Sequence, residues 1–442
     1  MAKSQNLRDS SPVVLLKLDR VSRIFLLIGD GRGAGVTAVL QQAQGKSHGN
    51  KPSFQIVRPS GKRGTGTGSN HHVAHSHGTE SIGKKTMAEV SILKATYSAP
   101  GIEPLLEPLG GMERFIEEGD RVLLKVNLLS ARKPEKAVTT HPEFVRAVAT
   151  AVRKVGGCPY IGDSPSGTFS GRTLRRAYKQ SGLEELANEH DIPLNYDTGI
   201  RKLDIPNGKR LTRSPVCNYV LDADKVIALP KLKTHSYQYM TLGCKILYGA
   251  VPGLTKAKYH AQFPRRAAFA DVLLDVLMVV KPQLFIMDGI LGMQGQGPGS
   301  GDPVNLGWVL ASTDPVAMDI AVCRIIGIEP VGIPVLKRAK IRHLWPERID
   351  YPLLKPEDIA IAGFKLPNTA DHLLTGKKPP RKNPVVTEKC IGCGDCERIC
   401  PRGAVTVDGE VAELNYSRCI RCFCCHEVCP ENAIKLGRVK VK

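Results

Sequence analysis

The feature that most constrains the fold is a cysteine motif that occurs twice near the end of the 442-residue chain. Each copy has the spacing C-x2-C-x2-C-x3-C and is followed by proline. The first copy consists of Cys390, Cys393, Cys396 and Cys400, and the second consists of Cys419, Cys422, Cys425 and Cys429. This spacing is typical of proteins that hold two four-iron clusters. We therefore predict two [4Fe–4S] clusters in a ferredoxin-like domain.

The fourth cysteine of each run is expected to bind the other cluster. The first cluster should be held by Cys390, Cys393, Cys396 and Cys429, and the second by Cys419, Cys422, Cys425 and Cys400. The intervening sequence AVTVDGEVAEL predicts a β-hairpin with a turn at Asp408–Gly409. Two zinc sites are the main alternative, but such sites usually pair short C-x-x-C knuckles across a longer loop. Cys424 is left over, and we expect a free thiol near the second cluster.

Thirteen cysteines could also indicate a secreted, disulfide-rich protein. However, nine of the 13 lie between Cys390 and Cys429, which favours a metal centre in a reducing compartment. No apolar run reaches the roughly 18 residues that are needed to span a bilayer. The early apolar stretches are interrupted by charges, so they do not indicate a signal peptide. We therefore expect a cytoplasmic protein without a membrane span.

Composition divides the chain into four parts. Residues 1–86 include a Gly/Ser/Thr-rich stretch and carry 13 basic against 4 acidic residues, which predicts a low-complexity, disordered extension. Residues 87–375 form the predicted α/β domain, residues 376–386 a linker rich in Pro and Lys, and residues 387–442 the cluster domain. The chain has a formal charge of +20, but it shows no nucleic-acid-binding signature. We predict no nucleic-acid partner.

Short apolar segments alternate with helical patterns through the large domain. Strands are expected at 121–129, 159–162, 224–230, 284–288 and 308–313, and helices at 141–155, 171–188, 265–280, 314–326 and 333–344. A long glycine-rich loop is expected at 287–301. Such alternation is typical of a parallel sheet that helices cover on both faces. We predict an α/β fold with a mostly parallel, doubly wound sheet, followed by a small α+β ferredoxin-like domain.

Polar residues follow several of these expected strands. Because parallel strands end together at one edge, where open α/β sheets bind ligands, we expect these residues to share a site. The candidates for catalysis are Lys231, Lys233, His235, Asp163 and Asp288. The candidates for cofactor or ligand binding are Lys125, Asn127, Ser164, Gly167, Lys245, His260 and Gly289. Lysines outnumber aspartates among them, which favours an anionic small-molecule ligand.

Longer blocks of the chain resemble the domain of unknown function 362 family. The main block is KLKTHSYQYMTLGCKILYGAVPGLTKAKYH at 231–260, and KVNLL, TTHPEFVRAV, GDSPSG, MDGILGMQGQGPGSG and ASTDPVAMD are similar to other blocks of that family. The resemblance covers about residues 88–328 and the ferredoxin tail that many members carry. It implies iron–sulfur binding and redox chemistry, without a settled reaction. Ile246 stands where the family pattern has Asn, which puts a side-chain hydrogen bond there in doubt.

Three functions fit these patterns. The leading hypothesis is an enzyme that passes electrons through two clusters to an anionic substrate or redox cofactor in the α/β domain. A flavin or deazaflavin would be a suitable two-electron cofactor, although no flavin fingerprint is visible. A redox partner protein or a small molecule would donate or accept the electrons. The alternatives are a non-enzymatic binding, assembly or electron-carrier protein, and a non-redox, isomerase-like enzyme with an appended ferredoxin.

Overall fold

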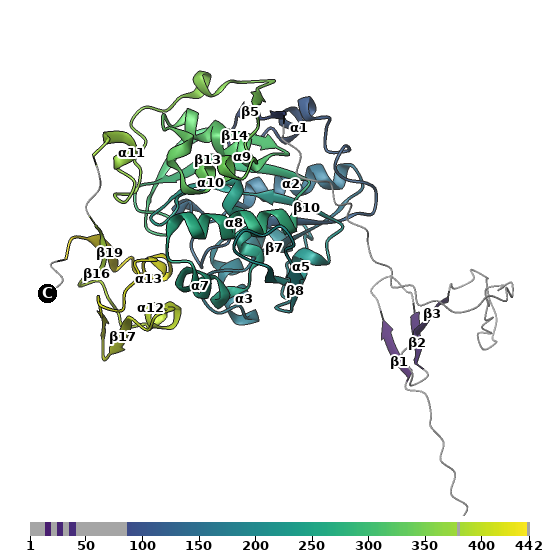
Figure 1. Ribbon diagram of the computed structural model, residues 1–442. Helices are drawn as coiled ribbons and strands as arrows, with labels where there is room; N and C mark the ends of the chain where they lie inside the picture. The colour runs from purple at the N-terminus through teal and green to yellow at the C-terminus, as the bar shows by residue number, and fades with distance from the viewer. Residues whose placement is uncertain (1–13, 19–23, 30–34, 41–85, 378–380, 440–442) are drawn as a thin grey trace, which may run out of the picture. The chain divides into compact units, whose positions relative to one another are not determined.

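The computed structural model describes residues 14–18, 24–29, 35–40, 86–377 and 381–439 (Figure 1). The chain forms two compact units, Met1–His77 and Gly78–Lys442. In the first unit, β1 (Val14–Leu18), β2 (Ile24–Gly29) and β3 (Gly35–Leu40) pair as an antiparallel sheet in this order. The rest of residues 1–85 lies outside the described residues, so the disorder of this segment stays a prediction.

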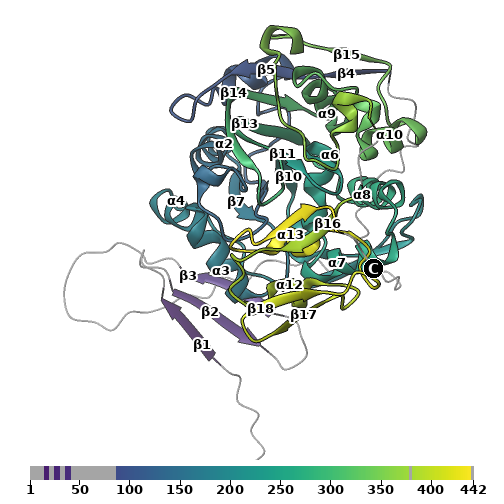
Figure 2. The ribbon, with the colours of Figure 1, turned by 90° about the vertical axis from the view of Figure 1, so that its left-hand side faces the viewer.

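The second unit is built on an eight-stranded mixed sheet (Figures 1 and 2). Its strands are β5 (Ser91–Lys94), β6 (Arg121–Val126), β7 (Cys158–Gly162), β10 (Lys225–Leu229), β11 (Lys231–His235), β12 (Tyr239–Thr241), β13 (Leu284–Gln294) and β14 (Asp302–Ser312). The order is β12-β11-β13-β10-β6-β7, and β14 pairs with both β13 and β5. The pairs among β7, β6, β10, β13 and β11 are parallel, whereas β12, β14 and β5 run antiparallel to their neighbours. This confirms the predicted mostly parallel α/β fold.

Helices cover both faces of this sheet. Residues of β13 alternate between the faces, because successive side chains of a strand point to opposite sides. Leu284 and Ile286 pack with α2 (Pro142–Lys154), whereas Phe285 and Met287 pack with α8 (Arg266–Val280). The remaining helices that cover the sheet are α1 (Ile102–Leu106), α3 (Gly171–Gln180), α4 (Leu183–Glu189), α9 (Pro315–Ile325) and α10 (Pro334–Ile341).

Shorter elements surround this core. The two-stranded sheets of the α/β domain pair β4 (Met87–Glu89) with β15 (Arg348–Asp350), and β8 (Ile200–Asp204) with β9 (Arg213–Cys217). The short helices are α5 (Asn218–Leu221), α6 (Gly243–Ile246), α7 (Gly253–Gln262) and α11 (His372–Thr375). Within the described residues, none of the helices combines the length and the apolar composition that crossing a membrane requires.

Two local predictions are wrong. The helix expected at 171–188 is interrupted at Gly182, whose φ of +74° favours glycine and ends the helical turn. The glycine-rich loop expected at 287–301 is mostly strand, because β13 continues to Gln294 and pairs with β14. Gly289 explains this error: a Cβ atom there would lie 2.4 Å from the ring of Trp308. The glycine permits close packing between strands and does not mark a loop.

The cysteine-rich domain has two short antiparallel strand pairs and two helices. β16 (Asn383–Val386) pairs with β19 (Ile434–Gly437), and β17 (Val405–Asp408) pairs with β18 (Val411–Leu414). The helices are α12 (Asp395–Ile399) and α13 (Cys424–Val428). The predicted hairpin is therefore present, but its two-residue turn is Gly409–Glu410, one residue later than expected. β16 also begins within the segment predicted as a linker.

The cysteine-rich domain packs against the α/β domain beside α7 (Figures 1 and 2). The guanidinium group of Arg132 donates hydrogen bonds to the carbonyl oxygens of Cys429 and Pro430. Asn368 Nδ2 donates to the carbonyl oxygen of Leu436 at 3.1 Å. Ala257 of α7 packs against Ile399 and Cys424 in a small apolar cluster. These contacts hold the cysteine motifs against the edge of the sheet where strands β6 and β7 end.

Candidate functional site

The eight motif cysteines surround two separate cavities. The first cavity encloses about 340 Å³, its open mouth included, and is lined by Cys390, Cys393, Cys396 and Cys429. The second encloses about 330 Å³ by the same measure and is lined by Cys400, Cys419, Cys422 and Cys425, with Cys424 beside them. The structure thus brings together the same two groups of cysteines that the motif spacing pairs.

The backbone around these cavities fits the binding of iron–sulfur clusters. Backbone N–H groups approach three of the sulfurs: Ala412 N lies 3.4 Å from Cys390 Sγ, Ala404 N 3.1 Å from Cys400 Sγ and Ala433 N 3.2 Å from Cys429 Sγ. Such N–H···S hydrogen bonds stabilise cluster thiolates and tune their potential. Each cavity therefore offers four thiols and a polar backbone, which is a suitable donor set for a four-iron cluster.

Both cysteine loops also share an unusual backbone conformation. Gly392 and Gly394 have positive φ angles in the first motif, and Arg421 and Phe423 have them at the equivalent positions of the second. Left-handed backbone is costly for residues with a Cβ atom and is often retained at functional sites. The two loops therefore adopt the same shape despite their different side chains, as expected if each wraps around the same kind of group.

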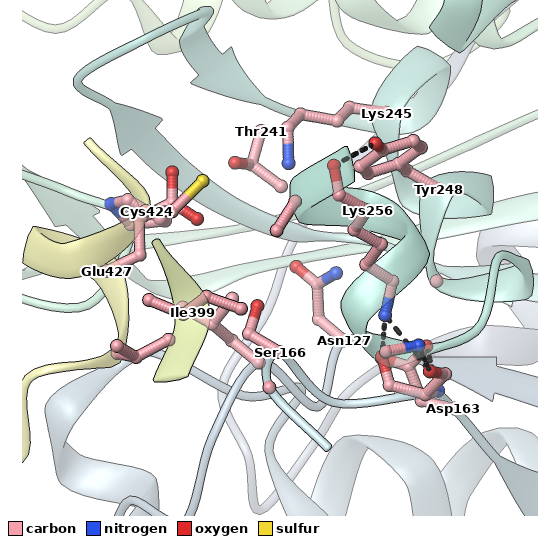
Figure 3. A pocket seen from close by; sticks show the side chains of 18 of the residues that line it. Asn127, Asp163, Ser166, Thr241, Lys245, Tyr248, Lys256, Ile399, Cys424 and Glu427 are labelled. Carbon is pink, nitrogen blue, oxygen red and sulfur yellow. Dashed lines mark hydrogen bonds between the residues drawn. The ribbon is translucent and has the colours of Figure 1, made fainter. Parts of the chain in front are cut away.

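A larger pocket lies between the α/β domain and the cysteine-rich domain (Figure 3). It encloses about 700 Å³, its open mouth included. The α/β domain contributes mostly polar residues from the strand ends and from α6 and α7. These include Asn127, Asp163, Ser164, Ser166, Lys233, Thr241, Lys245, Tyr248, Lys256 and His260. Across the pocket stand Ile399, Cys424, Glu427 and Val428. Because Cys424 also lines the second cysteine cavity, the pocket and this cavity share a wall.

Three lysines give the pocket a positive character. Lys233 is buried, and its Nζ donates to the carbonyl oxygen of Val138 at 2.6 Å. Burial and then the charge of Lys245 lower the pKa of Lys233 to about 7. Burial lowers the pKa of Lys256 to about 8, and that of Lys245 also falls below its usual value for the same reason. The lysines are thus held close together at a desolvation cost, which an anion in the pocket would reduce.

On the α/β side of the pocket, three polar atoms have no hydrogen-bond partner in the described part of the chain. They are Asn127 Oδ1, Thr241 Oγ1 and His260 Nδ1. Burial and the neighbouring Lys245 lower the pKa of His260 to about 3, so its ring is neutral at physiological pH. Buried polar atoms are normally hydrogen-bonded, so these three atoms are available to a ligand that carries donor groups.

His235 and Glu427 meet behind the pocket wall. His235 Nδ1 accepts hydrogen bonds from the backbone nitrogens of Tyr237 and Gln238, at 3.0 and 3.3 Å. In the neutral ring the proton is therefore on Nε2, which faces Glu427 Oε1 at 3.3 Å. Burial raises the pKa of Glu427 to about 7, partly offset by Lys245 and Lys233. This contact joins β11 of the α/β domain to α13 of the cysteine-rich domain.

A buried ion pair closes one end of the pocket. Lys125 Nζ lies 2.7 Å from Asp163 Oδ1, and the carboxylate also accepts from the backbone nitrogens of Leu128 at 2.6 Å and Ser164 at 2.8 Å. Gly249 packs directly against the pair, because a Cβ atom there would lie 2.0 Å from Asp163 Oδ1. Lys125 therefore holds the carboxylate of Asp163 in place and does not line the pocket itself.

Lys231 and Asp288 form a second ion pair that is separate from the pocket. Lys231 Nζ lies 2.7 Å from Asp288 Oδ2 and 2.9 Å from the hydroxyl of Tyr97. The carboxylate also accepts from the backbone nitrogen of His141 at 3.0 Å. Burial is the main cause that lowers the pKa of Lys231, and Asp288 counteracts it. Neither residue lines the pocket, so the structure does not bring all five predicted catalytic residues together.

The predicted site residues therefore fall into three groups. Lys233, Asp163, Asn127, Ser164, Gly167, Lys245 and His260 line the pocket. His235 and Lys125 do not line the pocket, but they contact the lining residues Glu427 and Asp163, respectively. Lys231 and Asp288 lie in the separate pair, and Gly289 packs against Trp308. Sequence reasoning missed Thr241, Tyr248 and Glu427. Thr241 and Tyr248 belong to the main family block, but Glu427 lies within the second cysteine motif, and no signal links that motif to the lysines.

Comparisons with known proteins agree with this architecture. The family described as a domain of unknown function (DUF362) matches residues 122–324, and a 4Fe-4S dicluster domain matches residues 389–438. A thylakoid-associated protein of Synechocystis sp. is 37% identical over 292 residues, which are 63% of this chain and 87% of that relative. The chain belongs to the DUF362 family and carries a C-terminal 4Fe–4S dicluster domain. It is thus an iron–sulfur protein.

Likeness to solved structures is weak. The lactate racemase apoprotein from Thermoanaerobacterium thermosaccharolyticum matches with a TM-score of 0.32 and 14% identity, over 52% of this chain and 54% of the racemase. A protein of Thermotoga maritima matches with a TM-score of 0.31 and 12% identity, over 50% of this chain and 57% of that protein. This chain thus spans about half the length of each, and no functional argument rests on them. The comparisons support the predicted clusters but give no support to a flavin.

Proposed function

We propose that this chain is an iron–sulfur oxidoreductase whose substrate or redox cofactor is an anionic small molecule bound in the interdomain pocket. The eight motif cysteines would hold two [4Fe–4S] clusters, which when bound supply one-electron transfer. The observation that carries this proposal is the shared wall: Cys424 lines both the second cysteine cavity and the lysine-rich pocket. A ligand in the pocket would therefore sit next to one redox centre, as electron transfer requires.

The lysines account for the binding of an anion. Lys233 Nζ makes one hydrogen bond within the described residues, so two of its three N–H groups remain for a ligand. Lys245 Nζ has no hydrogen-bond partner there and lies 5.8 Å from the centre of the Tyr248 ring. A carboxylate or phosphate oxygen would satisfy these donors and relieve the repulsion between the two charges.

The same residues suit the proton transfers that accompany reduction or oxidation of an organic ligand. With a pKa of about 7, Lys233 can hold or release a proton at Nζ near neutral pH. The unpartnered His260 Nδ1 can form a hydrogen bond with a hydroxyl group of the ligand, as acceptor or donor according to its tautomer. Ile399 and Val428 form the apolar part of the wall on the side of the cysteine-rich domain.

The test is the reoxidation of the reduced, iron-loaded full chain under anaerobic conditions. Small molecules that copurify with the chain are identified by mass spectrometry and added back, and cluster absorbance is followed. We expect ligand-dependent reoxidation that Lys233→Met slows at least tenfold without changing iron content. Lys389→Met, an exposed lysine outside the pocket, serves as the matched control. Reoxidation that no added molecule accelerates, or equal rates in both variants, would refute the proposal.

A further inference from the structure

A second concave site, which we call the basic groove, lies at the surface beside the second cysteine cavity. It encloses about 680 Å³, its mouth included. Its lining residues include Arg266 of the α/β domain, Arg381 and Lys382 in the segment that leads into β16, and Arg421 of the cysteine-rich domain, but no acidic residue. Ile420 and Phe423 complete the wall toward the second cavity, which they also line.

The cations of the basic groove have no acidic partner among the residues that the structure describes. Within the described residues, none of its four cationic side chains forms an ion pair. Arg266 Nε donates to the carbonyl oxygen of Tyr237 at 2.8 Å, and Arg421 Nε donates to Asn383 Oδ1 at 2.9 Å. Both bonds fix the side chain but leave the positive charge available to an acidic group from outside.

The backbone supplies an independent argument. The loop of the second motif has the same left-handed conformation as that of the first, yet Arg421 and Phe423 stand where the first motif has Gly392 and Gly394. A side chain at such a position costs conformational energy that glycine avoids. Phe423 is buried, whereas Arg421 is only partly buried and faces the groove. The strain at Arg421 is understandable if its cation has a role at the surface.

We propose that the basic groove is the docking site of an electron-carrier protein with an acidic face. The groove wall is the loop that carries Cys419 and Cys422, so a carrier seated there lies beside the second redox centre. Its cations are partly exposed and spread over two domains, which suits a protein surface better than the buried, convergent donors of a metabolite site. In the docked complex one electron leaves the carrier and one cluster takes it up, with no bond made or broken.

The opposite end of the cysteine-rich domain favours the same orientation. Glu388, Glu410 and Glu431 are exposed there, together with one cation next to Glu388, Lys389, and Glu410 and Glu431 lie close to the first cavity or its lining loop. An acidic carrier is repelled from that end and attracted to the basic groove, so the domain's own field would steer it. The proposal rests on the iron–sulfur domain and is independent of which ligand occupies the pocket.

The test measures binding of an oxidised, acidic flavodoxin to the full-length, iron-loaded chain. The variant Arg381→Gln/Lys382→Gln removes two groove cations that have no hydrogen-bond partner among the described residues. The control Lys389→Gln/Arg438→Gln removes the same charge from exposed residues outside the groove. We expect the groove variant to weaken binding roughly fivefold or more and to flatten its salt dependence, while the control changes it less than twofold.

A second readout separates docking from cluster chemistry. Reduction by flavodoxin hydroquinone should slow in the groove variant to the same extent, whereas reduction by dithionite should be unchanged. Equal effects of the two variants on flavodoxin binding would overturn the proposal. So would a groove variant that keeps flavodoxin binding but loses binding to phosphatidylglycerol vesicles or to an RNA oligonucleotide, since the groove would then serve a different partner.

Discussion

Lys231 and Lys233 stand two residues apart on β11 and are equally buried, at 0% and 1% exposure, yet they lie in different surroundings. Lys231 meets the carboxylate of Asp288 and the hydroxyl of Tyr97, and it is not among the residues that line the interdomain pocket. Lys233 meets one carbonyl oxygen and faces the interdomain pocket. Residue type and burial are the same for these two lysines. What distinguishes them is their hydrogen-bond partners: Lys231 is paired with a carboxylate, whereas Lys233 keeps donor groups that a ligand could use.

The largest difference between the two lysines is expected in stability. Removing one partner of a buried ion pair leaves the other charge uncompensated and typically costs about 3–5 kcal/mol. Lys231→Met should therefore lower the free energy of unfolding by that amount, as measured by urea denaturation of the iron-loaded chain. Lys233→Met removes a charge that has no counter-ion in direct contact, so it should change stability by less than about 1 kcal/mol.

The double variant Lys231→Met/Asp288→Asn is the control for this prediction. It removes both charges, so it should recover a large part of the loss caused by Lys231→Met alone. If Lys231→Met and Lys233→Met destabilised the chain equally, the distinction between the closed ion pair and the open site would be wrong.

The second prediction concerns ligand affinity, for which the substitution of Lys233 should have the larger effect and that of Lys231 the smaller. A hydrogen bond to a charged group contributes about 1.5–3 kcal/mol, so Lys233→Met should weaken binding of the ligand that drives reoxidation roughly ten- to a hundredfold. Lys231 does not line the pocket, so a folded Lys231→Met chain should bind the ligand nearly as the unmodified chain does. Calorimetric titration at low salt measures both. A loss of ligand affinity in Lys231→Met would contradict this prediction, because it would mean that the Lys231–Asp288 pair and the pocket act as one binding site.

The third prediction uses pH to separate binding from stability. An anionic ligand prefers protonated lysines, so its affinity should fall as pH rises through the pKa of Lys233, about 7, and then that of Lys256, about 8. The decline is at most about tenfold per pH unit for each proton lost. Stability should respond with the opposite sign. Between pH 7 and 10.5 the unfolded chain binds more protons at Lys233 than the folded chain does, so this residue makes stability rise with pH.

The comparison with Lys233→Met isolates the residue responsible. In that variant the step in affinity near pH 7 should disappear and the step near pH 8 should remain, as followed by the same titration at constant ionic strength. A step near pH 7 that survives the substitution would assign the titration to another group.

The strands, helices and cysteine groups were largely predictable because they depend on local signals. Apolar runs identify β6 and β10, and Pro142 and Asp314 mark the starts of α2 and α9. The spacing within each motif places three cysteines on one short loop, and the known two-cluster pattern supplies the fourth cysteine from the other motif. In the strands, the helices and each cysteine loop, residues that are close in sequence determine the local structure.

The division of the polar residues between two regions was not predictable in this way. Strand periodicity places Lys231 and Lys233 on one face, but the register shifts between them: Lys231 pairs with Asp288, and Lys233 pairs with Met293. This irregularity lies in the glycine-rich half of β13, for which the glycine pattern predicts a loop. Glu427 could not be placed either, because its contact with His235 depends on how the two domains pack.

The smallest effect is expected at Lys256, which is intermediate between the two lysines on β11. Its Nζ lines the pocket but already donates to the carbonyl oxygen and hydroxyl of Ser164 and to the carbonyl oxygen of Pro165, so all three of its N–H groups are used. A ligand can therefore gain only the longer-range attraction of its charge. Lys256→Met should weaken ligand binding about two- to fivefold by calorimetric titration, well below the effect of Lys233→Met. An equal or larger loss would mean that Lys256 releases Ser164 and turns to the ligand, and that free donor groups do not identify the residues that bind it.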